Sequence, residues 1–135
     1  TSPRLFPPLE PMKSILVIDD SEEFCGLARG ALERVGYAVD TCQQVEPALE
    51  LLGTGLRPSL VVLDALMPGR DGFDFIRAAA QIAPELKVLL VSGWVDLARL
   101  PATVKVTGKL EKPFTPDQLV EAVRGAVGDP RSRSS

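Results

Sequence analysis

Residues 14–21 read SILVIDDS, an apolar run from Ser14 to Ile18 followed by the acidic pair Asp19-Asp20 and by Ser21. A short apolar run rich in β-branched side chains is typical of a strand buried on both faces of a sheet. Ser21 is a candidate N-cap for a helix. Apolar residues recur after it at helical spacing: Phe24, Leu27, Ala28, Ala31, Leu32 and Val35. This stretch therefore predicts a strand, an acidic turn and a helix, the repeating unit of a parallel α/β sheet.

The same alternation continues along the chain. Further strands are predicted at Tyr37 to Cys42, Leu60 to Leu63, Leu86 to Val91 and Gly108 to Glu111. Further helices are predicted around Val45 to Leu52, Phe73 to Ala83, Val95 to Leu100 and Leu119 to Val127, with Gly36 ending the first helix and Thr115-Pro116 starting the last. Right-handed crossovers leave few arrangements of such a chain. We expect a doubly wound, five-stranded parallel sheet of order 2-1-3-4-5 with helices on both faces.

Length and composition describe one globular domain. The chain has 135 residues, 45% hydrophobic and 24% charged, with a net charge of −3. A Pro-rich linker is expected over residues 1–12, the domain over 13–127 and a flexible tail over 128–135. Basic residues do not cluster, so we expect no direct nucleic-acid binding, and no apolar stretch is long enough to cross a bilayer.

Two residue counts restrict the chemistry. The sequence has no histidine, which excludes a Ser–His–Asp triad, a histidine-bearing metal site and a phosphohistidine carried by this chain. Cys25 and Cys42 are too few for a disulfide framework or a zinc site. We interpret them as small buried residues in a reducing compartment and expect a cytoplasmic protein.

Polar side chains follow four of the predicted strands at their carboxyl ends: Asp19 and Asp20, Asp64, Ser92, and Lys112. In this fold those ends meet at one edge of the sheet, where ligands bind. Three neighbouring carboxylates repel each other, so Lys112 and a divalent cation are needed to offset their charge. Oxygen ligands without nitrogen or sulfur favour Mg²⁺. A carboxylate beside Mg²⁺ and a lysine can attack a phosphoryl donor, which predicts an aspartyl phosphate.

Each of these signals has an ordinary alternative when taken alone. Asp19-Asp20 fits helix capping, Asp64 fits a strand-to-turn aspartate, Ser92 fits turn chemistry and Lys112 fits a solvated surface charge. Their convergence on one predicted edge favours a functional site.

The order of four motifs resembles the response-regulator receiver domain of two-component signalling. The motifs are Ile18-Asp19-Asp20, Leu63-Asp64-Ala65-Leu66-Met67-Pro68-Gly69, Val91-Ser92-Gly93 and Lys112-Pro113-Phe114. The resemblance spans residues 13–127 and implies the flavodoxin-like receiver fold.

The resemblance also implies a role for each site residue. Asp64 would accept the phosphoryl group, and Ser92 and Lys112 would contact the phosphoryl oxygens. Asp20 would bind Mg²⁺ directly and Asp19 largely through water, with the carbonyl of Leu66 completing the protein ligands. The Lys112–Pro113 bond is expected to be cis, as in the family.

The implied partner is a histidine kinase or a histidine phosphotransfer domain, because this chain carries no histidine of its own. Output would pass through the face of the fourth helix, fifth strand and last helix, which in the family also makes dimer contacts and so allows a homodimer. We expect no enzyme activity of the domain itself. The chain would be a stand-alone regulator or the C-terminal receiver of a hybrid histidine kinase.

Two alternatives stay open. A phosphatase with an aspartyl nucleophile needs a second aspartate two residues later, and Leu66 stands there. The acidic cluster, Ser92 and Lys112 argue against a phosphorylation-independent interaction module. That alternative stays open because Lys109 stands where the family usually has an aromatic switch residue. Gly26 and Gly30 are either tolerated surface glycines or a point of close approach for the donor's helices.

Overall fold

The computed structural model describes residues 12–65, 72–92 and 105–130. Five parallel strands form one sheet of order β2-β1-β3-β4-β5. The strands are β1 (Ser14–Ile18), β2 (Ala38–Cys42), β3 (Leu60–Asp64), β4 (Lys87–Ser92) and β5 (Lys105–Glu111). The helices are α1 (Glu22–Val35), α2 (Val45–Gly53), α3 (Gly72–Ile82) and α4 (Pro116–Val127). The predicted fold class and strand order are confirmed, whereas the helix predicted over Val95 to Leu100 lies outside the described residues.

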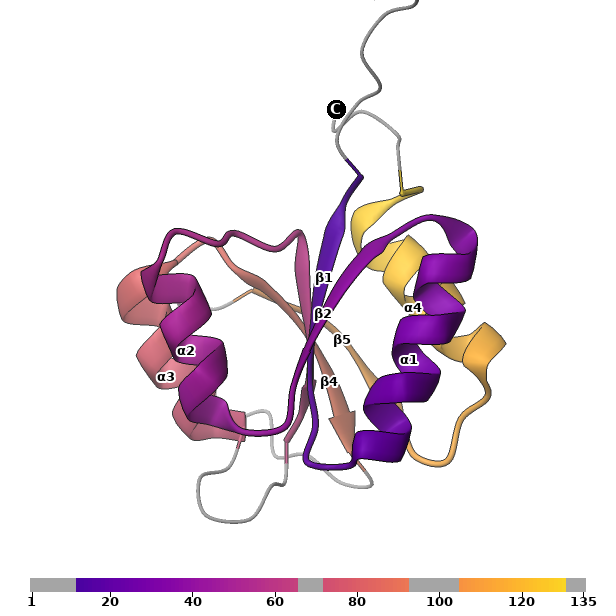
Figure 1. The fold of residues 1–135 in the computed structure, drawn as a ribbon, viewed down its shortest axis with the longest axis horizontal. Helices are drawn as coiled ribbons and strands as arrows, with labels where there is room; N and C mark the ends of the chain where they lie inside the picture. Colours follow the sequence, from indigo (N-terminus) through magenta and orange to yellow (C-terminus); the bar gives the residue numbers. More distant parts are fainter. Residues whose placement is uncertain (1–11, 66–71, 93–104, 131–135) are drawn as a thin grey trace, which may run out of the picture.

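The sheet separates two apolar cores (Figure 1). Helices α2 and α3 cover one face, and α1 and α4 cover the other. Every residue of β3 is buried, because helices pack against both of its faces. No described helix is long and apolar enough to span a bilayer.

Local capping explains where the helices begin and end. The Ser21 side chain accepts a hydrogen bond from the Phe24 N–H at 3.0 Å and so caps α1. Gly36 ends α1 in the left-handed region, with φ of 113°. Thr115 and Gln118 form a reciprocal capping box at the start of α4. These three signals act within a few residues, which is why the sequence alone predicted them.

The buried face of α1 differs from the predicted one. Cys25, Ala28 and Leu32 face the sheet, whereas Leu27 and Val35 are 45% and 37% exposed. On a helix, a stripe through positions 25, 28 and 32 leaves position 27 on another face, whereas Val35 continues the stripe and is the last residue of the helix. Cys25 is thus buried as predicted, as are Ala28 and Leu32 from the predicted apolar set, whereas Leu27 of that set is exposed.

Strand β5 is longer than predicted, beginning at Lys105 rather than Gly108. It pairs with β4 along its whole length, with one register shift where Val88 pairs with Val106 and Leu89 with Gly108. Edge strands tolerate polar side chains because one of their sides is free of the sheet. The polar start of β5 therefore hid the strand from a search for apolar runs.

The start of the segment predicted to be a flexible tail is packed against the domain. Pro130 is buried beside Gly36, and its carbonyl accepts a hydrogen bond from the Lys13 N–H at 2.9 Å. The hydroxyl of the buried Tyr37 donates to the Gly128 carbonyl. Residues 128–130 of the predicted tail thus contact the domain, and residues 131–135 lie outside the described residues.

Candidate functional site

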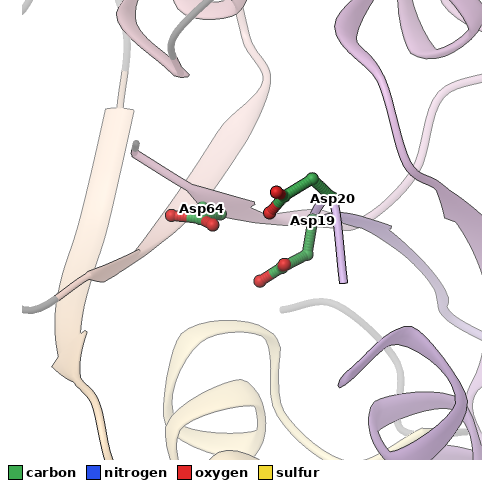
Figure 2. Close-up of side chains that lie close together, drawn as sticks. All are labelled: Asp19, Asp20 and Asp64. Carbon is green, nitrogen blue, oxygen red and sulfur yellow. The ribbon is translucent and has the colours of Figure 1, made fainter. Parts of the chain in front are cut away.

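The strand register places the predicted acidic residues at one edge of the sheet. Ile18 pairs with Leu63 across β1 and β3, so Asp19 and Asp64 follow on neighbouring strands. Figure 2 shows the side chains of Asp19, Asp20 and Asp64 gathered where these strands end. One carboxylate oxygen from each residue lies within 4.8 Å of the others. The prediction that these three residues come together is therefore confirmed.

The three carboxylates differ in burial. Asp19 is 1% exposed and Asp64 is 6% exposed, whereas Asp20 is exposed. Buried carboxylates are costly unless they are paired or hydrogen-bonded. Two members of the cluster thus need partners from the protein, and the third faces solvent at the opening of the site.

Asp19 is held by contacts on both carboxylate oxygens. Its Oδ1 accepts a hydrogen bond from the Ser21 N–H at 2.9 Å, and its Oδ2 accepts one from the Lys112 Nζ at 3.3 Å. The Cys25 thiol donates to the Asp19 carbonyl at 3.3 Å. This side chain is therefore fixed from the start of α1 and from the end of β5.

Lys112 links the acidic cluster to an aromatic pair. Its Nζ lies 3.3 Å from Asp19 Oδ2 and 3.7 Å from Asp64 Oδ2. It also lies 5.3 Å from the centre of the Phe24 ring, which meets the Phe114 ring edge-to-face at 5.7 Å. The Lys112–Pro113 peptide bond is cis, as the resemblance predicted. Lys112 thus supplies a positive charge at the predicted place.

The donor set fits Mg²⁺. Among the described residues it offers three carboxylates, whose oxygens are the hard ligands that this cation selects. Three carboxylates against one described ammonium leave negative charge that a divalent cation would offset. Asp19, Asp20 and Asp64 are therefore the residues that would hold Mg²⁺.

For the remaining predicted site residues, Ser92 and Leu66, the structure describes less. Ser92 is the last residue of β4 and pairs with Glu111, the residue before Lys112. Its backbone therefore stands at the same edge as the acidic cluster. Leu66 lies outside the described residues, so the role given to its carbonyl remains a prediction.

Gly72 is a site residue that the sequence analysis did not single out. A Cβ built on it would lie 2.7 Å from the Asp64 carbonyl oxygen and 2.8 Å from the Ala65 Cα. Its N–H donates to the Ala65 carbonyl at 2.9 Å. Only glycine permits this close approach, which brings the start of α3 against the backbone of Asp64. The sequence shows a glycine at the start of a predicted helix. It does not show which backbone atoms that glycine contacts.

The two cysteines are buried and free, as predicted for structural residues. Burial raises the pKa of both thiols, and the charges of Asp19 and Asp40 raise those of Cys25 and Cys42, respectively. Both thiols therefore stay protonated near neutral pH and are poor nucleophiles.

Comparison with known proteins agrees with this geometry. The chain is 32% identical over 123 residues to the nitrogen assimilation regulatory protein NtrX of Azorhizobium caulinodans, an alignment covering 88% of this chain and 27% of NtrX. It superposes with a TM-score of 0.76 on the chemotaxis protein CheY4 of Vibrio cholerae, at 25% identity and covering 85% of this chain and 98% of that one.

A third comparison concerns a response regulator protein from Burkholderia pseudomallei, solved with a phosphorylated aspartic acid, calcium ion and citrate. Its TM-score is 0.70 at 28% identity, covering 85% of this chain and 66% of that one. The chain spans between about a quarter and a half of the length of the first curated relatives that it matches. The family profile described as the response regulator receiver domain matches residues 15–124. This chain therefore belongs to the response-regulator receiver domains.

Proposed function

We propose that Asp64 accepts a phosphoryl group from a phosphohistidine of a partner protein, and that the domain acts in a two-component phosphorelay. The observation that carries this proposal is the buried Asp64 carboxylate, which lies beside Asp19, Asp20 and Lys112 at the end of β3. The donor must be another protein, because this chain has no histidine.

The reaction is a transfer between two acceptors. An Asp64 oxygen forms a bond to phosphorus, the bond from phosphorus to the donor imidazole nitrogen breaks, and that nitrogen keeps the bonding electrons. The product is an acyl phosphate on Asp64. Bound Mg²⁺ would supply positive charge toward the transferring oxygens.

Lys112, Ser92 and the other two aspartates have separate proposed roles in this transfer. Lys112 lies between Asp19 and Asp64, where its ammonium can pair with a phosphoryl oxygen. Ser92, at the end of the neighbouring strand, is the proposed hydroxyl donor. Asp20 is the exposed carboxylate and is proposed to bind Mg²⁺ directly, whereas Asp19 would act largely through water.

We propose that the domain is a phosphoryl acceptor and not a turnover enzyme, and that it works in the cytoplasm with a histidine kinase or histidine phosphotransfer domain. The solved Burkholderia relative carries a phosphorylated aspartic acid, which supports this chemistry for the fold. The two free, buried cysteines agree with a reducing compartment.

The output step is proposed to work without an inward-moving aromatic ring. Lys109 occupies that position, is exposed, and pairs with Glu111 at 3.5 Å. Burying its charge would be costly. Crystal structures with and without a phosphoryl mimic should both leave Lys109 exposed, and a buried Lys109 in the phosphorylated form would refute this part of the proposal.

Intact-mass spectrometry after incubation with Mg²⁺ and acetyl phosphate tests the acceptor. We expect one added phosphoryl group on the native chain and none on Asp64→Asn or after chelation of Mg²⁺. Asp40→Asn is the matched control, because Asp40 is an exposed aspartate on β2. A native chain that gains no mass, or an Asp64→Asn variant that gains it, would refute the proposal and favour a phosphorylation-independent module.

A further inference from the structure

Phe24 contacts Lys112, the ammonium beside the acidic cluster. The Lys112 Nζ lies 5.3 Å from the centre of the Phe24 ring, within the range of a cation–π contact. Phe24 stands in the first turn of α1, whereas Lys112 follows β5, so the contact joins two segments far apart in sequence. We propose that Phe24 is a positioning residue, which holds the Lys112 ammonium in place for the phosphoryl group. This inference rests on the proposed function.

Lys112 needs such a support because its side chain is long and 39% exposed. A lysine side chain loses much rotamer freedom when it is held in one geometry. Its two carboxylate partners, Asp19 and Asp64, are the groups that would also engage Mg²⁺ and the phosphoryl group. The Phe24 ring is neutral, and it is proposed to bind neither Mg²⁺ nor the phosphoryl group. It can therefore keep its contact with the ammonium while the carboxylates change theirs.

The ring itself is fixed from two sides. The Phe24 N–H donates to the Ser21 side chain at 3.0 Å, which sets the start of α1 directly after the acidic pair. The Phe114 ring meets the Phe24 ring at 5.7 Å and 89°, an edge-to-face pair that favours one ring orientation. Lys112 and Phe114 flank Pro113, so the same short segment supplies both the ammonium and the ring that orients Phe24.

The competing explanation is apolar packing alone. Phe24 and Phe114 are partly buried against the core between the sheet and helices α1 and α4. A leucine at position 24 would retain most of that packing but has no π face. A tyrosine would retain both. These two substitutions therefore separate packing from the ring's interaction with the ammonium.

The test measures the initial rate of phosphorylation by acetyl phosphate with Mg²⁺ in the native chain, Phe24→Tyr and Phe24→Leu. We expect Phe24→Leu to be slower by about two- to fivefold, the range of an exposed cation–π contact, and Phe24→Tyr to match the native rate. The Mg²⁺ dissociation constant, measured by calorimetry, should be the same in all three, because the described ring contacts of Phe24 are with Lys112 and Phe114. In nuclear magnetic resonance spectra, the ring-current shift of the Lys112 side chain should persist in Phe24→Tyr and disappear in Phe24→Leu.

Leu27→Ala is the matched control, because Leu27 is an exposed apolar residue three positions further along α1. Its phosphorylation rate should equal that of the native chain. A Phe24→Leu rate equal to the native rate would overturn the inference while leaving the proposed function intact. A Phe24→Leu variant with weakened Mg²⁺ binding would also overturn it, by showing a general disturbance of the site. A native chain that takes up no phosphoryl group would remove the proposed function and this inference with it.

Discussion

The two ends of the sheet differ in the kind of side-chain contacts that they hold. At the amino end of β1, Tyr37 is buried, its hydroxyl donates to Gly128, and Pro130 packs beside Gly36. At the carboxyl end, three carboxylates lie within 4.8 Å and Lys112 is the ammonium that contacts two of them. The contacts at the first end stabilise the fold. The second concentrates like charge, which disfavours the folded state but creates a place for a cation and a phosphoryl group.

The largest expected effect is at the amino end. Tyr37→Ala should lower the free energy of unfolding by about 3–5 kcal/mol, the usual cost of removing a buried aromatic ring. Tyr37→Phe, which removes only the hydroxyl bond to Gly128, should cost about 1 kcal/mol. Urea unfolding measures both values. The Mg²⁺ dissociation constant should not change in Tyr37→Phe, and a change there would contradict the independence of the two ends.

Gly72→Ala should affect both stability and the site. The added methyl would lie less than 3 Å from backbone atoms of Asp64 and Ala65. Backbone atoms cannot relieve the clash by a rotamer change, as a side chain can. We expect a loss of about 1–3 kcal/mol in unfolding free energy, as for other overpacked positions, together with weaker Mg²⁺ binding. Gly53→Ala is the control, because a Cβ there meets nothing within 4 Å. Equal behaviour of the two variants would show that the close approach does not shape the site.

Asp64→Asn should change stability in the opposite direction. Within the described part of the chain, the carboxylates of Asp19 and Asp20 lie beside Asp64 and the Lys112 ammonium lies 3.7 Å from it, so we expect removal of its charge to relieve more repulsion than attraction. In a chelator we expect the free energy of unfolding to rise by about 1–2 kcal/mol. Added Mg²⁺ should narrow this difference, because the cation stabilises the native cluster more than the variant. A variant less stable than the native chain in chelator would show that the Lys112 contact outweighs the repulsion.

The sequence predicted most of the fold because its signals are local. Apolar runs marked β1, β3 and β4, and caps at Ser21, Gly36 and Thr115 marked helix ends. It missed the first residues of β5, since their place in the sheet depends on pairing with β4 and not on hydrophobicity.

The acidic cluster was predictable for a topological reason. The carboxyl ends of parallel strands meet, so Asp19 and Asp64 had to lie close once the strand order was known. The role of Gly72 and the contact between Phe24 and Lys112 were not predictable in this way. Both depend on distances between segments that only the packed structure defines.

The smallest expected effect concerns Gly26 and Gly30 on α1, and it extends the comparison to the surface beside the site. Both glycines are exposed, and a Cβ built on either meets nothing within 4 Å. Each change to alanine should therefore raise the free energy of unfolding by about 0.5–1 kcal/mol, because alanine loses less backbone freedom in a helix. The phosphorylation rate with acetyl phosphate should stay unchanged, since neither residue contacts the acidic cluster. The rate from a phosphohistidine donor decides between the two interpretations of these glycines. We expect it to stay unchanged as well, and a slower transfer to Gly30→Ala alone would instead identify this helix surface as a point of close contact with the donor.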